Sequence, residues 1–265
     1  MTSRITSRTP KQEKQLKRFI EDAVERILQE VNPDKDGLQC LFAKGGKYQN
    51  YLVDGARRFT AKAPNYDLAR TILGKDFISP EEIAQARNLA YTDEHLAFFG
   101  DSLPDKASLE WCRDNGMMLV AGPPKPMSLL DVRNVKNDDF YSKEGGWYAE
   151  NEQEFSRDDK IETKWIAVRK EPIAGSLSKS WSEQRELITD PAIVPNTAET
   201  VWALTTYKAV RGVYLLPNHY VRTSSLGSHG YRVCVGSFGA EGLSVDSYWD
   251  GVRFDDLGLA AARKF

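Results

Sequence analysis

The stretch from Gly230 to Phe265, "GYRVCVGSFGAEGLSVDSYWDGVRFDDLGLAAARKF", decides how this chain is interpreted. Part of it forms a regular frame of apolar, turn and packing residues: Val233, Val235, Gly236, Gly239, Gly242, Trp249, Leu257, Gly258 and Arg263. Other positions in and beside it share no chemistry: His229, Cys234, Ser237, Asp246, Tyr248, Gly251, Val252 and Phe254. Function often concentrates in loops that a rigid scaffold holds, so these eight positions are the candidates for a binding surface.

The length and composition of the whole chain place only wide limits on its fold and function. A chain of 265 residues holds one large domain or two small ones. The net charge of -2 gives no general case for binding nucleic acid or an anionic membrane. The first eighteen residues are locally basic, which we interpret as a frayed tail leading into a solvated helix face, with a nucleic-acid-binding arm as the alternative.

The sequence also bears on the cellular compartment. It has no apolar run long enough to span a bilayer and no hydrophobic core of a signal peptide, so we expect a cytoplasmic protein. The widely spaced cysteines Cys40, Cys112 and Cys234 are odd in number, which argues against a disulfide framework and suits a reducing compartment. Cys112 is expected to pack in a core as a small hydrophobic residue.

Residues 1–110 are predicted to be mainly helical. Apolar residues recur at helical spacing from Leu16 to Val31, and Asn32-Pro33 ends that pattern. Ser79, followed by a proline and by a glutamate three positions on, predicts a helix start, and Thr92 predicts another. The segment 103–116 predicts a third helix, and a turn is expected within 41–53.

From Met117 onward the pattern changes to strands separated by long polar loops. Strands are predicted at 117–121, 164–172, 213–216, 219–224 and 231–238. Helices are predicted at 178–188 and, between the cap Asn196 and Gly212, at 196–212. After 238 we expect an irregular loop, with a last strand pairing near 231–238. The fold class is therefore α+β.

We find no catalytic motif and no spacing of metal ligands in the sequence. The histidines His95, His219 and His229 lack metal-ligand spacing to one another or to a cysteine. No nucleophile elbow, dinucleotide fingerprint or HExxH motif is present. Paired aspartates such as Asp255-Asp256 are interpreted as solvated turns, with calcium binding as the alternative. We predict no catalytic residue, no metal and no cofactor, and a protein that is not an enzyme.

The segments "YVRTSS", "GYRV.VG.F", Trp249 and "R.DDLGL..AR" resemble the C-terminal variable region of diversity-generating retroelement variable proteins. Upstream segments extend the resemblance over about 111–265. It implies a loop-rich C-type lectin fold related to that of the formylglycine-generating enzyme, with a variable region at about 223–263. The mainly helical region 1–110 would precede this domain and is not explained by the resemblance.

The family's mechanism would account for the unmatched positions. A reverse transcriptase errs at template adenines, so Asn codons of the AAY type scatter into many residues but never into Lys, Glu, Gln, Met or Trp. All eight candidate residues are reachable from such a codon. Between Thr223 and Arg263 only Glu241 and Trp249 are unreachable types. The chain departs from some members by lacking a long Tyr/Asn/Ser-rich run.

The resemblance also implies roles for the frame and the face. Glycines would form tight turns, Trp249 and Leu257 would pack, and Arg263 would tie the last strand. Tyr248 and Phe254 would be aromatic anchors for a protein or cell-surface ligand. Cys234 is expected to be free and partly exposed. The competing interpretation makes Val252 and Phe254 ordinary core contacts.

Two other functions stay open at this point. One is an oxidase of the formylglycine-generating type, whose copper site needs two nearby cysteines, a pair that the sequence does not offer. The other is a phage-related structural or interaction protein whose helical N-terminal region docks to a larger assembly. No nucleic acid is expected on the variable face, and the oligomeric state and the ligand are left open.

Overall fold

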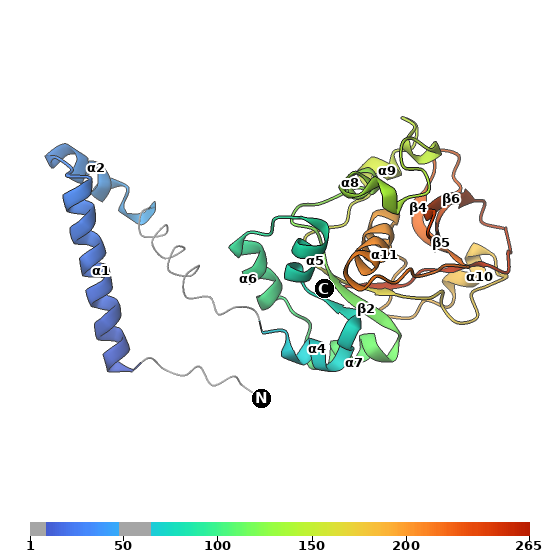
Figure 1. The fold of residues 1–265 in the computed structure, drawn as a ribbon, viewed down its shortest axis with the longest axis horizontal. Coiled ribbons are helices and arrows are strands. Elements are labelled where there is room, and N and C mark those ends of the chain that lie inside the picture. Colours follow the sequence, from blue (N-terminus) through green and yellow to red (C-terminus); the bar gives the residue numbers. More distant parts are fainter. Residues whose placement is uncertain (1–8, 48–64) are drawn as a thin grey trace. The chain divides into compact units, whose positions relative to one another are not determined.

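The computed structural model describes residues 9–47 and 65–265 (Figure 1). The chain divides into two compact units, Met1–Thr60 and Ala61–Phe265. This division lies near residue 60 and not at residue 110, because residues 65–110 are built into the second unit. Strand β1 (Phe77–Ile78) pairs with β2 (Met117–Ala121), and helix α4 (Asp67–Leu73) packs on α7 (Lys106–Asp114).

The N-terminal unit contributes two described helices, α1 (Pro10–Glu30) and α2 (Lys35–Ala43). Helix α1 ends one residue before Val31 and the Asn32-Pro33 pair, as the sequence predicts. Residues 1–8 of the basic tail, and residues 48–53 of the expected turn, lie outside the described residues.

The C-terminal unit carries the remaining described helices, and three of them begin at the capping residues that the sequence indicates. Ser79, Thr92 and Asn196 each form a capping box, and Gly212 adopts the left-handed conformation that ends the longest helix of this unit. The helices not yet named are η1 (Gly74–Asp76), α5 (Pro80–Arg87), α6 (Asp93–Asp101), α8 (Leu129–Val135), η2 (Asn137–Asp139), η3 (Trp147–Ala149), α9 (Phe155–Asp158), α10 (Trp181–Arg185) and α11 (Thr197–Arg211).

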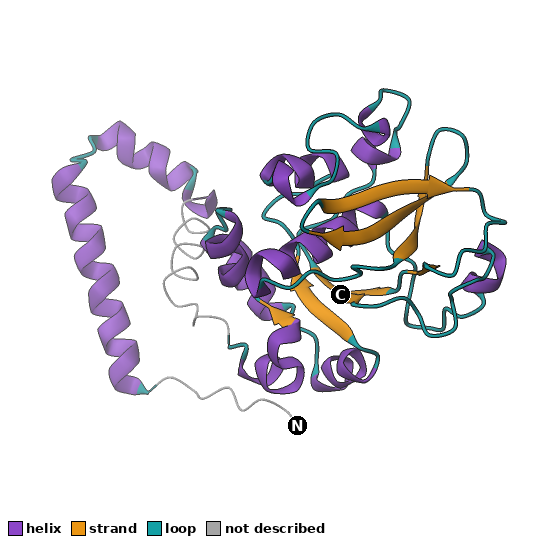
Figure 2. Ribbon diagram, turned by 45° about the vertical axis from the view of Figure 1, so that its right-hand side comes forward, coloured by secondary structure: helices purple, strands orange, loops and turns teal. Residues whose placement is uncertain are grey.

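The strands form two four-stranded mixed sheets, with helices and long loops around them (Figure 2). The first sheet has the order β1-β2-β3-β8, with β3 at Trp165–Arg169 and β8 at Ala262–Lys264. The second has the order β6-β5-β4-β7, comprising β4 (Tyr220–Leu226), β5 (Arg232–Gly239), β6 (Gly242–Tyr248) and β7 (Leu257–Leu259). The fold is therefore α+β, as predicted.

Three strand predictions are wrong. Residues 213–216 form no strand; they follow the Gly212 cap, and Val213 and Tyr214 are exposed. Residues after 238 are not an irregular loop, because β6 continues the β5 hairpin and β7 and β8 follow. The last strand pairs with β3 in the first sheet and not with β5. Strands of three residues, such as β7 and β8, are too short to show a period of two.

Helix α11 joins the two sheets, since it contacts β3 in one and β4 and β5 in the other (Figure 1). The Trp202 indole donates a 2.9 Å hydrogen bond to the carbonyl of Ala121 in β2. The buried Arg87 guanidinium lies 4.6 Å from the Trp202 ring centroid. At the helix start, the Thr197 and Thr223 hydroxyls are 3.0 Å apart. These contacts set the position of β4 and β5.

One prediction concerns the frame glycines of β5. A Cβ on Gly236 would fall 2.0 Å from the His219 carbonyl oxygen, whereas a Cβ on Gly239 would meet no atom within 4 Å. We expect Gly236→Ala to destabilise the protein by about 2–3 kcal/mol, because the β4 backbone must move. Gly239→Ala is the matched control and should stay within about 0.5 kcal/mol, measured by thermal melting. Equal melting temperatures for the two variants would contradict this account.

Candidate functional site

The outer face of the second sheet carries several of the unmatched residues. Cys234 lies directly opposite Arg222 on one side and Asp246 on the other, and Arg232 lies opposite Tyr248. Opposite residues in neighbouring strands project to the same face. The alternate residues, such as Thr223, project toward α11, where the Thr197 hydroxyl meets them. The sheet thus separates a core face from an outer face.

Asp246, Tyr248 and Phe254 form a cluster on the outer face. The Tyr248 hydroxyl donates a 2.9 Å hydrogen bond to the Asp246 carboxylate. The Phe254 ring packs edge-on against Tyr248 with centroids 5.3 Å apart, although 47% of Phe254 remains exposed. Burial, and next the bond to Asp246, raise the pKa of Tyr248, so its phenol stays a neutral donor. The cluster offers an aromatic surface beside a carboxylate.

The β6–β7 loop, residues 249–256, is held by main-chain hydrogen bonds. Arg222 is completely buried, and one of its guanidinium nitrogens donates to the Val252 carbonyl at 2.7 Å. The carbonyl of Asp250 accepts from the Trp181 amide at 2.8 Å. The carbonyl of Phe254 accepts from the Ser178 amide at 2.9 Å. Main-chain contacts therefore hold the loop backbone at three positions. Two of its side chains add ion pairs, Asp250 with Arg232 and Arg253 with Glu183.

The Arg222 guanidinium also contacts α10 and the segment before it. The second terminal nitrogen donates to the Lys179 carbonyl at 3.0 Å and to the Gln184 side-chain oxygen at 2.8 Å. Gln184 is itself buried and donates to the Ser176 and Leu257 carbonyls. Burial lowers the pKa of Arg222 from its ordinary value. Carbonyl dipoles around the guanidinium replace the water that burial removes.

The expectation that Cys234 is partly exposed is wrong. It is completely buried in β5, and burial raises the pKa of its thiol to about 12. Its side chain projects to the same side of the sheet as Arg222 and Asp246 but is closed off from solvent, so it is not part of the exposed surface. Cys40, Cys112 and Cys234 are all free, and Cys112 is buried, as expected for a small core residue.

The packing role expected for Trp249 is also wrong, since 60% of this residue is exposed. Trp249 follows the end of β6 in a turn closed by the Val252 amide on the Trp249 carbonyl. Its ring lies over Gly251, where an added Cβ would fall 2.1 Å from a ring atom. Substitution of Gly251 would therefore displace the Trp249 ring. Leu257 is buried, and Arg263 donates to Ser108 in α7, so these two frame roles agree with expectation.

The remaining positions do not all converge on one patch. His229 is exposed in the β4–β5 turn, with its ring 6.4 Å from that of Tyr231. Ser237 lies at the other end of β5, in a bulge with φ of 46° where its amide donates to the His219 carbonyl. Val252 is half-buried in the loop and not a core residue. Ser237 is thus the position that the structure separates from the rest.

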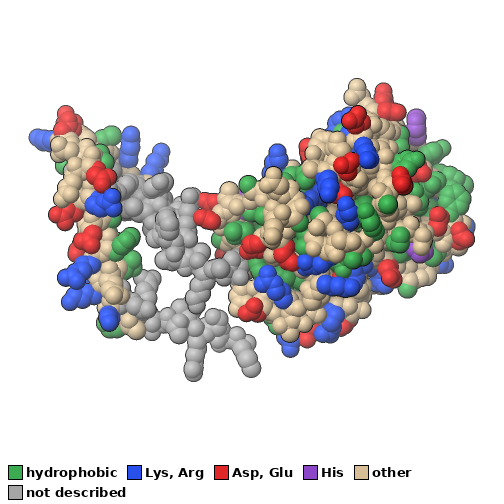
Figure 3. Space-filling view, viewed as in Figure 1, with side chains coloured by type: hydrophobic (Ala, Val, Ile, Leu, Met, Phe, Trp, Pro, Cys, Tyr) green, Lys and Arg blue, Asp and Glu red, His purple; other side chains and the backbone are tan. Residues whose placement is uncertain are grey.

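Hydrophobic side chains gather at the end of the C-terminal unit where β6 lies (Figure 3). Tyr231 and Trp249 lie just outside the paired ends of β5 and β6, next to the Arg232–Tyr248 pair, and both are exposed. We call the set His229, Tyr231, Asp246, Tyr248, Trp249, Val252 and Phe254 the outer face cluster. Contiguous exposed apolar surface of this kind marks interaction sites on soluble proteins.

A cleft of about 500 Å³ borders the outer face cluster. The Arg232 guanidinium lies 4.0 Å from the Trp181 ring centroid at its wall and also faces Asp250 at 3.5 Å. Its lining residues are Trp181, Arg185, Ile188, Ala192, Ile193, Val194, Ser224 and Arg232. The cleft adds a cationic, aromatic border to the face.

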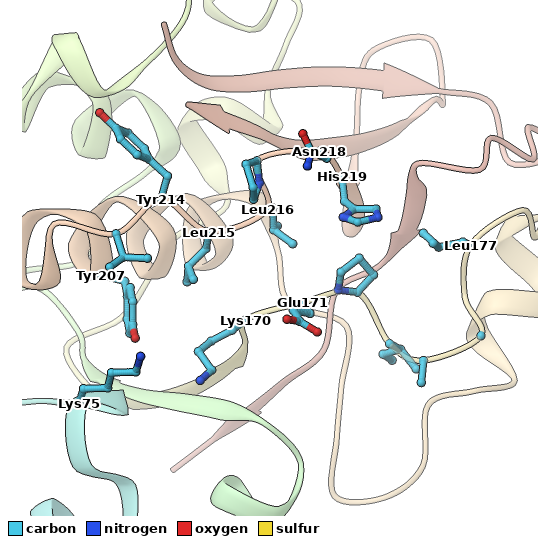
Figure 4. Close-up of a pocket in the computed structure, with 16 residues that line it drawn as sticks. Lys75, Lys170, Glu171, Leu177, Tyr207, Tyr214, Leu215, Leu216, Asn218 and His219 are labelled. Atoms are coloured by element: carbon cyan, nitrogen blue, oxygen red, sulfur yellow. The ribbon is translucent and has the colours of Figure 1, made fainter. Parts of the chain in front are cut away.

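A second hollow, of about 570 Å³, lies between the C-terminal end of α11 and residues 170–177 (Figure 4). Two of its lining residues bond to Asp76, which accepts from the Tyr207 hydroxyl at 2.9 Å and from the Lys170 ammonium at 2.5 Å. Burial and this bond raise the pKa of Tyr207 to about 12. Because none of the eight candidate positions lines this hollow, we do not place the functional site there.

Comparison with known proteins identifies no relative: no protein family, no curated protein and no solved structure matches this chain. Among residues 9–47 and 65–265, no group of three or more His, Cys, Asp or Glu side chains could hold a metal ion. No described helix combines the length and hydropathy needed to cross a bilayer. The outer face cluster is therefore the feature of this chain that bears on its function.

The buried arginine gives a stability prediction. We expect Arg222→Ala to cost about 3–5 kcal/mol, because it leaves Gln184 and the carbonyls of Lys179 and Val252 without donors. Arg253→Ala, in the same loop but exposed in its ion pair with Glu183, should cost less than about 1 kcal/mol. Chemical unfolding of both variants provides the measurement. An Arg222 variant as stable as the Arg253 variant would show that the loop is held in another way.

The cysteine environments predict a reactivity pattern. In the folded protein at mildly alkaline pH, a soluble aromatic disulfide reagent should modify the exposed Cys40 and spare the buried Cys112 and Cys234. Unfolding in denaturant should release all three thiols. Rapid modification of Cys234 in the folded state, identified by peptide mass, would mean that the sheet is not covered as described.

Proposed function

We propose that the C-terminal unit is a ligand-binding display domain of the C-type lectin type, whose outer face is diversified by adenine-directed mutagenesis from a retroelement template. One observation carries the proposal: side chains of unmatched chemistry stand on a backbone whose carbonyls accept hydrogen bonds from the buried Arg222 and from the main chain of Ser178 and Trp181. The resemblance of the C-terminal segments to variable proteins supplies the mechanism.

A display surface needs side chains that can change while the backbone stays in place. The contacts at positions 250, 252 and 254 meet this need, since each uses the carbonyl of the loop residue and not its side chain. Replacing Val252 or Phe254 leaves the hydrogen bonds from Arg222 and Ser178 intact. Position 246 differs, because the Asp246 side chain accepts a hydrogen bond from Tyr248, and replacement of either residue removes that bond.

The chemistry of the face suits a macromolecular ligand. Aromatic side chains such as Tyr248, Trp249 and Phe254 provide large contact area at low cost in conformational entropy, and polar neighbours such as Asp246 add hydrogen bonds. The proposed contact set is the outer face cluster. Cys234 is excluded by burial and Ser237 by its place at the far end of β5.

The origin of the diversity can be tested in the flanking DNA. The proposal expects a reverse transcriptase gene and a near-copy of the last hundred or so bases of this gene. The copy should differ at adenines within the codons of the outer face cluster other than Trp249, and should match at the frame codons for Gly236, Leu257 and Gly258. Absence of such a copy, or differences spread evenly over frame and face, would refute the retroelement mechanism.

Binding capacity gives a separate prediction. We expect a library randomised at His229, Asp246, Tyr248, Val252 and Phe254 to yield binders when selected on an immobilised soluble protein. Selected variants should melt close to the starting protein, because surface substitutions usually change stability by no more than about 0.5 kcal/mol each. Serine at the same five positions should abolish capture and leave the melting temperature in the same range.

A control library at five exposed positions in and after α5 separates this result from generic surface tolerance. These positions are Glu81, Gln85, Ala86, Asn88 and Ala90. Equal yields of binders from the two libraries, or loss of folding in most members of the face library, would contradict the proposed function.

A further inference from the structure

Helix α1 presents an apolar face that the described residues of the N-terminal unit leave exposed. Every residue of α1 whose burial is described is exposed, including Phe19 at 72%. The exposed large apolar residues at helical spacing are Leu16, Phe19, Ile20, Val24 and, one residue past the helix, Val31. Most of the stability of a helix in a protein comes from the packing of its apolar face. We therefore expect the apolar face of α1 to pack against a partner.

The charges of α1 are separated along its axis. Its first half, residues 10–18, carries Lys11, Lys14, Lys17 and Arg18 against Glu13. Its second half, residues 21–30, carries Glu21, Asp22, Glu25 and Glu30 against Arg26. One end of the helix is therefore basic and the other acidic, each with an excess of three charges by this tally.

We infer that α1 pairs with α1 of a second copy of this chain, in antiparallel orientation, through the face around Phe19 and Ile20. In that arrangement the basic half of each helix lies beside the acidic half of the other, and both apolar faces are buried. A parallel pair would place Lys beside Lys and Glu beside Glu. An anionic membrane would repel the acidic half, whereas membrane-binding helices are rich in Lys and Arg on their polar face.

The first test is the mass of the full chain in solution, measured by sedimentation over a dilution series. The wild type should sediment at twice the chain mass. Phe19→Glu should raise the dimer dissociation constant at least about 100-fold, because it places a charge in the apolar face. Tyr141→Glu, at an equally exposed aromatic of the C-terminal unit, should leave the dimer intact. A monomeric wild type, or a dimer that survives Phe19→Glu, overturns the inference.

Charge reversal tests the complementarity. A variant with Lys14→Glu, Lys17→Glu and Arg18→Glu has an acidic helix throughout, and one with Glu21→Lys, Asp22→Lys and Glu25→Lys has a basic one. Each variant alone should be monomeric at concentrations where the wild type is dimeric, and an equimolar mixture should restore the dimer. Dimers of either variant alone would contradict the charge argument.

Orientation is tested by cross-linking in a Cys40→Ser background. A short bifunctional maleimide should join a Lys11→Cys chain to a Gln29→Cys chain in the mixture, and should join neither variant to itself. Self-linked Lys11→Cys chains would indicate a parallel pair and overturn the inference. Co-sedimentation of the wild type with phosphatidylserine vesicles, reduced by Phe19→Glu, would assign the face to a membrane instead.

Discussion

The buried guanidinium of Arg222 is the contact on which the outer face depends. It links two regions that are distant in sequence: α10 with the main chain just before it, through Gln184 and Lys179, and the loop that follows β6, through Val252. A charge with no exposed surface is stable only where dipoles replace its hydration, and here carbonyl and amide oxygens do so. The loop between β6 and β7 keeps its shape for this reason.

Helix α11 holds the two sheets together in the core beneath the outer face. Its Trp202 reaches β2 and its Thr197 reaches β4, so the two small sheets are held to a common core. The outer face of the second sheet is then left to carry side chains that the core does not need. Two chains joined through α1 would present two such faces, and a pair of tethered sites raises avidity without any new contact at either site.

Local signals predicted much of the fold. Capping residues such as Ser79, Asn196 and Gly212 mark helix ends because they hydrogen-bond or turn the backbone locally. Strand pairing was harder to predict from the sequence. Strand β8 pairs with β3 in the first sheet, and a segment of three residues does not specify such a long-range partner by itself. The site was predicted in part. Phe254 and His229 are exposed as expected, while Cys234 is buried and Trp249, just past the end of β6, is exposed.

The sequence did not identify Arg222 as a site residue. Its position within the short predicted strand 219–224 was the available signal, because a charged residue there needs polar partners if it is buried.

The most direct test of the account is a scan of all single substitutions from Thr223 to Arg263, extended to Arg222, with protease resistance of the displayed protein as the measure of folding. The account predicts that positions 229, 248, 252 and 254 accept most residues, and that positions 222, 234, 236 and 257 accept few. Equal tolerance at the two sets, or intolerance at Phe254 comparable to that at Leu257, would contradict the claim that a constant frame carries an exchangeable face.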